Sequence, residues 1–229
     1  MASTHKIACE DTNFSRHYPS FLLYFSQFLL IFAIFAVAMI VDIHTHNTQT
    51  QAQTIDAVGI HPWHSAEGDL SLVEGIIDEI DAVGEIGLDF ACDTPQEVQI
   101  EVFRAQLSLA EQGKKPVVLH CVRAFEQTML ILTEYHLTAV IFHGFIGSKE
   151  QAQRAVNQGF YLSFGERTFR SPKTIEALRS TPLSQLFVET DESTTPIEEI
   201  YAKIAELRDI PTTELTHATE ENYNRIFKG

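Results

Sequence analysis

The chain has 229 residues, 45% of them hydrophobic, and its 31 acidic residues outnumber 16 basic ones. This length can bury one substantial core and does not require a second folded domain. The net charge of −15 argues against a long basic groove for duplex nucleic acid, so any contact with a polyanion must be local. Three cysteines at unrelated spacings support neither a disulfide framework nor a zinc ribbon, and they favour a reducing compartment.

Residues 1–38 form an N-terminal extension whose apolar run, Phe21 to Ala38, approaches the length of a membrane-spanning helix. Three interpretations stay open: a secretory signal, a retained anchor, or upstream sequence before a true start at Met39. The anchor is disfavoured because a buried strand begins directly after the run and leaves no linker. We expect one folded unit over residues 39–229 without stable membrane association, cytoplasmic if Met39 is the start and exported if the signal is genuine.

After Met39, short β-branched runs alternate with amphipathic stretches, which predicts βα units around a mostly parallel sheet. Seven strands are predicted, at Ile40–His44, Ala57–Ile60, Ala82–Ile86, Val117–His120, Ala139–His143, Phe160–Ser163 and Leu186–Glu189. Helices are predicted at Leu70–Ile80, Gln96–Gln112, Ala124–Tyr135, Lys149–Gln158, Thr174–Ser180, Ile197–Arg208 and Thr213–Phe227.

The polar segment 47–56 separates the first two predicted strands by only about ten residues, too few for a crossover helix. A complete (β/α)₈ barrel has eight strands. The predicted fold class is therefore α/β, a TIM-barrel-like (β/α) barrel shortened by about one βα unit.

Histidines and carboxylates gather at the ends of the predicted strands. Five of them lie at or just beyond the end of five different strands: His44, Glu85, His120, His143 and Asp191. In a parallel barrel the C-terminal strand ends converge on one rim, where catalytic groups collect.

Each of these residues also has a plainer explanation when it is taken alone. His44 and His46 form an H-x-H pair whose rings point the same way, as two ligands of one metal require, although an isolated pair is more often incidental. Glu85 lies in an apolar strand, where a carboxylate is costly unless it is bound to a metal or paired with an arginine. One histidine at the end of a buried strand is usually structural, but here His120 and His143 both end such strands, and imidazole is the commonest metal ligand.

Asp191 can bind a metal and orient or deprotonate an attacking water, or it can simply cap the turn that follows. Taken together, the four imidazoles and two carboxylates fit two divalent ions about 3.5 to 4 Å apart, which activate water and stabilise a leaving oxygen. Glu85 and Asp191 are the predicted catalytic residues. The donor set suits zinc, manganese or magnesium and does not choose among them.

Six motifs, DIHTH, VGIHPWH, VGEIGLDF, VLHCVRAF, IFHGFIGS and FVETDES, resemble in the same order the signature segments of the TatD family of metal-dependent deoxyribonucleases. The resemblance runs from about Met39 to Gly229. It implies that His44 and His46 hold one metal with Asp191.

The resemblance further implies that His120 and His143 hold the second metal and that Glu85 bridges the two. Arg123 would meet the substrate phosphate, as a planar donor fork can, and His61 would lie near the substrate rather than on a metal. The chain departs from the family in lacking a strand and helix within residues 47–56, and in the short segment after Asp191.

The leading hypothesis is hydrolysis of DNA phosphodiester bonds, at ends or in single strands, by water activated between two metals. A second hypothesis keeps the metals but replaces DNA with a small phosphoester, amide or lactone, since a fold does not fix a function. A third is an inactive barrel that retains metal for binding or structure. DNA or a small phosphoester is the expected partner, and no protein partner is implied.

Overall fold

The computed structural model describes residues 38–229, and the interpretations of residues 1–37 lie outside the described part. The chain divides into two units, Met1–Val37 and Ala38–Gly229, and the fold below is that of the second. Within the described residues, no helix combines the length and apolar character needed to cross a membrane.

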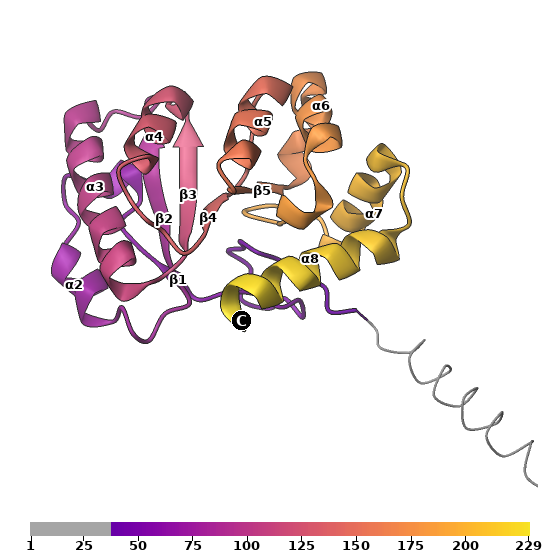
Figure 1. Ribbon diagram of the computed structural model, residues 1–229, viewed down its shortest axis with the longest axis horizontal. Coiled ribbons are helices and arrows are strands. Elements are labelled where there is room, and N and C mark those ends of the chain that lie inside the picture. The colour runs from indigo at the N-terminus through magenta and orange to yellow at the C-terminus, as the bar shows by residue number, and fades with distance from the viewer. Residues whose placement is uncertain (1–37) are drawn as a thin grey trace, which may run out of the picture. The chain divides into compact units, whose positions relative to one another are not determined.

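Six parallel strands form one sheet in the order β1-β2-β3-β4-β5-β6 (Figure 1). Their bounds are Ala57–Val58, Ala82–Asp89, Val117–Val122, Val140–Phe142, Tyr161–Phe164 and Leu186–Val188. Order in the sheet equals order in the chain, as expected when each strand is followed by a crossover that returns to its neighbour.

Helices connect the strands and follow the last one. They are α2 (Leu70–Gly75), α3 (Gln96–Gly113), α4 (Phe125–Leu132), α5 (Lys149–Asn157), α6 (Pro172–Ser180), α7 (Ile197–Arg208) and α8 (Thr212–Phe227). Short 3₁₀ helices lie at Pro62–His64 (η1), Glu166–Arg170 (η2) and Leu183–Gln185 (η3). Figure 1 shows α3 and α4 beside β2 and β3, and α5 and α6 beside β5, so the sheet is covered by helices as in a TIM-type barrel.

The first predicted strand, Ile40–His44, is joined to its neighbours by isolated bridges rather than a full ladder. Parallel bridges link Val41 to Gln53 and Thr45 to Asp191, and the Ile43 N–H donates to the Val188 carbonyl at 3.1 Å. The structure thus has six strands where seven are predicted, because the short segment 47–56 leaves room for only one paired residue beside Val41. These contacts connect β6 through residues 41–46 and Gln53 to β1, so the neighbours close a ring and the predicted fold class is confirmed.

Alternate residues along the strands enter two separate apolar clusters. Val118, Ile141 and Phe187 belong to an inner cluster, which α8 closes with Tyr223 and residues 226–227. The residues on either side of them in each strand belong to a larger cluster packed against the helices. Since the inner cluster also holds residues at the beginnings of strands, such as Ala82, α8 covers that end of the ring and the opposite, C-terminal rim is left for the site.

Candidate metal centre

The alternation that fills the ring with apolar side chains also places the polar ones. In a strand, residues two apart point to the same face. His120 lies two residues beyond Val118, and His143 two residues beyond Ile141, which are both members of the inner cluster. The imidazoles of His120, near the end of β3, and His143, just beyond β4, are therefore directed over the apolar interior.

Glu85 comes to the same place through an irregularity in β2. The pairing of β2 with β3 shifts register between Val83 and Ile86, both of which pack in the outer cluster. At Gly84 an added Cβ would lie 2.6 Å from the Cβ of Val118, so the two strands approach more closely than a side chain allows. The carboxylate of Glu85 then lies among the histidines of the neighbouring strands.

One oxygen of Glu85 faces His44 and His46, and Asp191 lies beside the same two imidazoles. Its Oε1 lies 2.9 Å from Nε2 of His44 and 3.4 Å from Nε2 of His46. Oδ1 of Asp191 lies 3.8 and 3.6 Å from the same two nitrogens. The backbone sets this group, because the His46 N–H donates to the Asp191 carbonyl and the Asp191 N–H to the His44 carbonyl.

The other oxygen of Glu85 faces a different set of imidazoles. Oε2 lies 2.9 Å from Nε2 of His143, 3.6 Å from Nδ1 of His120 and 3.8 Å from Nε2 of His61. The Nδ1 of His120 and the Nε2 of His143 are themselves 3.2 Å apart. A single carboxylate thus lies between two groups of potential ligand atoms, and His61, which the resemblance places near the substrate, lies beside the second group.

The donor chemistry of these groups fits divalent cations. Three overlapping sets of side chains have potential ligand atoms within 4.8 Å of one another: His44, His46 and Glu85; His44, His143 and Asp191; His61, Glu85 and His120. The Nε2 atom of His44 is buried and makes no hydrogen bond within the described residues, although Glu85 is beside it. A buried, unpaired ring nitrogen facing carboxylates is the arrangement that a metal ion satisfies.

The protonation of this cluster is set by opposing effects. Burial disfavours ionisation of Glu85, but the nearby imidazoles of His120, His143 and His44 outweigh it and hold the pKa of Glu85 well below its usual range. Burial also disfavours charge on His143, yet the carboxylates of Glu189 and Glu85 raise its pKa to about 10. Because only neutral imidazole binds a metal, ligation by His143 requires loss of that proton.

The pKa values of a neighbouring histidine and a neighbouring aspartate are shifted in the directions opposite to those of His143 and Glu85. Burial, reinforced by electrostatic repulsion from the imidazole of His120, lowers the pKa of His61 to about 4, so the imidazole of His61 is neutral near pH 7. Burial followed by repulsion from Glu189 raises the pKa of Asp191. A carboxylate made more basic in this way is better suited to accept a proton.

Two carboxylates that the sequence analysis did not single out lie behind the histidines. Oδ2 of Asp89 is 3.2 Å from Nε2 of His120, and Oε1 of Glu189 is 3.7 Å from Nδ1 of His143. In each case the carboxylate approaches the ring nitrogen that faces away from Glu85. Such partners fix the orientation and tautomer of a metal-binding histidine.

The alternation of side chains along the strands is the sequence feature that predicts the positions of Asp89 and Glu189. Asp89 lies two residues beyond Gly87 and four beyond Glu85, on the same side of β2 after the register shift. Glu189 comes two residues before Asp191, and it follows the inner-cluster residue Phe187 by the same interval. An acidic residue inside an apolar strand needs a partner, and both supply one to a histidine.

Arg123 follows β3 and lines a cavity of about 580 Å³ together with His46, His61, Glu85, His120, His143, Asp191 and other residues. Its backbone has a φ of 52°, and its side chain is exposed. Among the described residues its guanidinium makes no ion pair, which leaves its donors free for a ligand. All the residues predicted from sequence therefore line this cavity except His44, which lies 2.9 Å from Glu85. The metal-binding cluster that we propose consists of His44, His46, Glu85, His120, His143 and Asp191.

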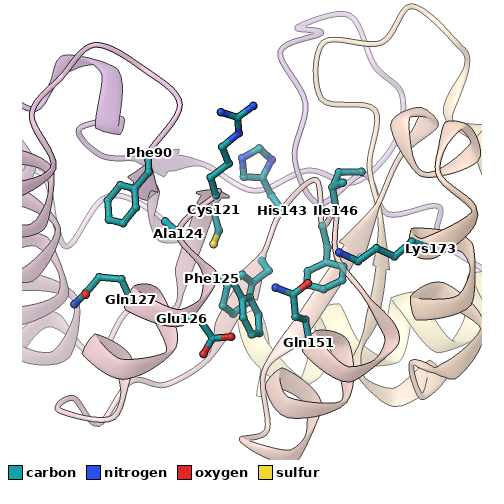
Figure 2. A pocket seen from close by; sticks show the side chains of 13 residues that line it. Phe90, Cys121, Ala124, Phe125, Glu126, Gln127, His143, Ile146, Gln151 and Lys173 are labelled. Carbon is teal, nitrogen blue, oxygen red and sulfur yellow. The ribbon is translucent and has the colours of Figure 1, made fainter.

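A second cavity, of about 500 Å³, adjoins the first and shares Cys121, Arg123, His143 and Ile146 with it. Figure 2 shows His143 in the upper part of this cavity, Phe125 near its centre and Lys173 extending into it from the right. The cluster of candidate metal ligands therefore borders two adjoining cavities.

Comparison with known proteins agrees with this geometry. The family model described as TatD related DNase matches residues 33–228. The chain is 34% identical over 195 residues to the uncharacterized metal-dependent hydrolase YabD of Bacillus subtilis, covering 75% of this chain and 76% of that one. It is 35% identical over 147 residues to the 3'-5' ssDNA/RNA exonuclease TatD of Salmonella typhimurium, covering 58% of this chain and 55% of the relative.

Among solved structures, the TatD homologue YjjV of Escherichia coli K12 superposes with a TM-score of 0.72 at 27% identity, and the match covers 93% of this chain and 95% of that one. The two chains therefore share the barrel arrangement over nearly their whole matched length. The match of the family model and the similarity of sequence and structure agree with a barrel whose rim carries imidazoles and carboxylates. The chain belongs to the TatD related DNase family of metal-dependent hydrolases.

Proposed function

We propose that this chain hydrolyses phosphodiester bonds in single-stranded nucleic acid, working from an end of the strand. The observation that carries the proposal is the position of Glu85, whose two oxygens face two separate groups of ligand atoms, in a cavity that also exposes Arg123. A relative named as a 3'-5' ssDNA/RNA exonuclease supports the choice of substrate.

In this proposal, His44, His46 and Asp191 would hold one divalent ion and His120 and His143 another, with one oxygen of Glu85 facing each group of ligands. Two such ions polarise the phosphoryl group and lower the pKa of water. Which ions bind, and how many, is left to metal analysis, because zinc, manganese and magnesium all suit these donors.

The protein's own groups then carry the remaining steps. Arg123 holds the non-bridging phosphate oxygens with its planar donor fork, which positions the phosphorus for attack. Asp191, whose pKa is raised by burial and by Glu189, accepts the proton of the attacking water. His61 stays neutral and adds no charge that would compete with a cation.

The decisive experiment is a nuclease assay with the full chain on single-stranded and duplex DNA of the same sequence, in the presence of zinc, manganese or magnesium. We expect shortening of the single strand from one end, with duplex degraded more slowly. Glu85→Ala should abolish the reaction, and Arg123→Ala should reduce it on the order of 100-fold, as expected for loss of one charged transition-state donor.

Two results would contradict the proposal. One is hydrolysis of small phosphoesters, amides or lactones without any action on oligonucleotides, which would make the chain a small-molecule hydrolase. The other is metal-dependent activity on DNA that Arg123→Ala leaves unchanged, which would remove the phosphate contact. Arg170→Ala is the matched control, since Arg170 is exposed and pairs with Glu166 at the far end of η2.

A further inference from the structure

Trp63 is a large aromatic side chain that remains exposed beside the metal-binding cluster. Its side chain is 56% exposed, and it lines the same cavity as Glu85, Arg123 and Asp191. Of the four large hydrophobic residues exposed in the described part of the chain, two, Trp63 and Ile146, border this cavity. Exposed apolar groups that gather in one hollow mark a binding site more often than a random surface does.

The indole of Trp63 is held in place on several sides. Its Nε1–H donates to Oδ2 of Asp89 at 2.7 Å, and Asp89 is itself only 4% exposed. Its backbone carbonyl accepts a hydrogen bond from the Thr94 hydroxyl at 3.0 Å. Its ring packs edge-on against the imidazole of His61, with ring centres 4.9 Å apart. Little rotational freedom is left to lose when a ligand binds, which favours affinity.

The same contact ties Trp63 to the metal-binding cluster. The Asp89 oxygen that accepts from the indole also lies 3.2 Å from Nε2 of His120. The indole and the imidazole of His120 have centres 6.3 Å apart. A flat group stacked on Trp63 would therefore lie beside the place where the phosphate meets the metals and Arg123.

The charge of the chain gives a reason why a flat aromatic side chain would be used for binding. The chain carries a net charge of −15, and the cavity has two arginines, Arg123 and Arg167, against the carboxylates of Glu85, Asp191 and Glu192. Beyond the one phosphate that the metals would meet, a site with so few basic side chains gains little from neutralising phosphates along a strand. Stacking of bases on aromatic rings supplies affinity that does not depend on charge or sequence.

We propose that Trp63 is the stacking platform for a nucleobase of the substrate, placed next to the phosphate that is hydrolysed. This inference rests on the proposed function and deepens it by naming an unpaired base as the recognised group. A base inside a duplex has both faces covered by its neighbours, so the platform selects single strands or frayed ends.

Trp63 is the single tryptophan of the chain, so its fluorescence reports on this site alone. The full-length protein with its metal is titrated with a short oligothymidylate that carries phosphorothioate linkages to slow hydrolysis. A second titration uses an abasic oligonucleotide of the same length and backbone. We expect saturable quenching by the oligothymidylate and little by the abasic strand, which should bind roughly 10-fold to 100-fold more weakly.

Variants separate stacking from a structural role. Trp63→Ala should weaken binding of labelled oligothymidylate by a similar factor and leave binding of the abasic strand unchanged, whereas Trp63→Phe should keep most of the affinity. Leu72→Ala, on a residue that is 69% exposed on α2 and outside this cavity, is the control and should change neither.

Equal quenching by both oligonucleotides, or equal loss of both affinities in Trp63→Ala, would overturn the stacking proposal while leaving phosphodiester hydrolysis intact. Conversely, base-dependent quenching by a protein that hydrolyses no oligonucleotide would support the platform and defeat the proposed function. The two failures are therefore distinguishable in the same set of samples.

Discussion

The Nδ1 atom of His143 lies 3.7 Å from Oε1 of Glu189, while Nε2 on the other side of the same ring lies 2.9 Å from Oε2 of Glu85. Glu189 is 1% exposed, and its second oxygen has no hydrogen-bond partner among the described residues. A carboxylate buried this deeply has a high desolvation cost unless it stabilises a positive charge or a ring N–H nearby. We infer that Glu189 keeps Nδ1 of His143 protonated so that Nε2 is directed to the metal.

Glu189→Gln keeps the size of the side chain but removes its charge. We expect metal affinity to fall roughly 10-fold to 100-fold, because outer partners of this kind tune ligand basicity and orientation. Isothermal calorimetry with the metal-free protein measures the change, and circular dichroism checks that the fold is retained. Asp89→Asn is the counterpart for His120 and should act in the same direction. Unchanged metal affinity in both folded variants would show that these carboxylates do not support the histidines.

Glu85→Gln tests the bridge between the two groups of ligands. The amide offers one oxygen and no charge, so we expect the variant to retain at most one tightly bound ion and to lose activity by roughly 100-fold or more. Elemental analysis after gel filtration gives the stoichiometry. Glu134→Gln is the matched control, since Glu134 is exposed and pairs with Arg104. A fully loaded, active Glu85→Gln protein would contradict the bridging role.

The pH dependence of metal binding follows from the charge on His143. Burial opposes charge on this ring, but Glu189 and Glu85 overcome it and raise the pKa to about 10, above the ordinary value of 6.5 for histidine, so near pH 7 the metal-free protein carries a proton that the metal must displace. Affinity should therefore rise with pH between those two values, by up to roughly tenfold per unit. Calorimetry in buffers of different ionisation enthalpy measures the proton released. In Glu189→Gln, which lowers the pKa of His143, the slope should be smaller; equal slopes would refute this account.

Much of the metal-binding cluster could be predicted from sequence because strand ends are local features. His120 and His143 each follow a run of apolar residues, and alternation fixes the face on which they lie. Chain topology then brings those ends together without any knowledge of side-chain packing. Whether the six residues hold two ions, and whether Arg123 contacts phosphate, stays a prediction.

The features that could not be predicted from the sequence depend on contacts between segments that are far apart in the chain. The contact of Trp63 with Asp89 spans 26 positions, and neither residue has a local pattern that points to the other. The first predicted strand, Ile40–His44, has the right composition, but a strand also needs a neighbour of sufficient length, and segment 47–56 supplies only Gln53. How many residues of a strand are paired depends on the neighbouring segment, and the composition of the strand itself does not reveal this.

Tyr201 forms hydrogen bonds with the backbone of the segment that leads to His44, one of the residues of the metal-binding cluster. Its buried hydroxyl donates to the Val41 carbonyl at 2.8 Å, accepts from the Val41 N–H at 3.3 Å and lies 2.8 Å from the hydroxyl of Thr219. Helices α7 and α8 are thereby joined to the residues that precede the H-x-H pair. Burial raises the pKa of Tyr201 far above its ordinary value, so the hydroxyl stays protonated and able to donate.

Tyr201→Phe should lower the free energy of unfolding by about 1–3 kcal/mol, because the backbone groups of Val41 and the Thr219 hydroxyl lose a buried partner. Urea denaturation of the metal-free protein measures this loss. Tyr223→Phe is the matched control, since the Tyr223 hydroxyl forms no hydrogen bond within the described residues, and it should shift stability by less than about 0.5 kcal/mol. If both variants unfold at the same urea concentration as the parent, the hydroxyl does not hold this segment in place, and the position of His44 must depend on its pairing with β6 alone.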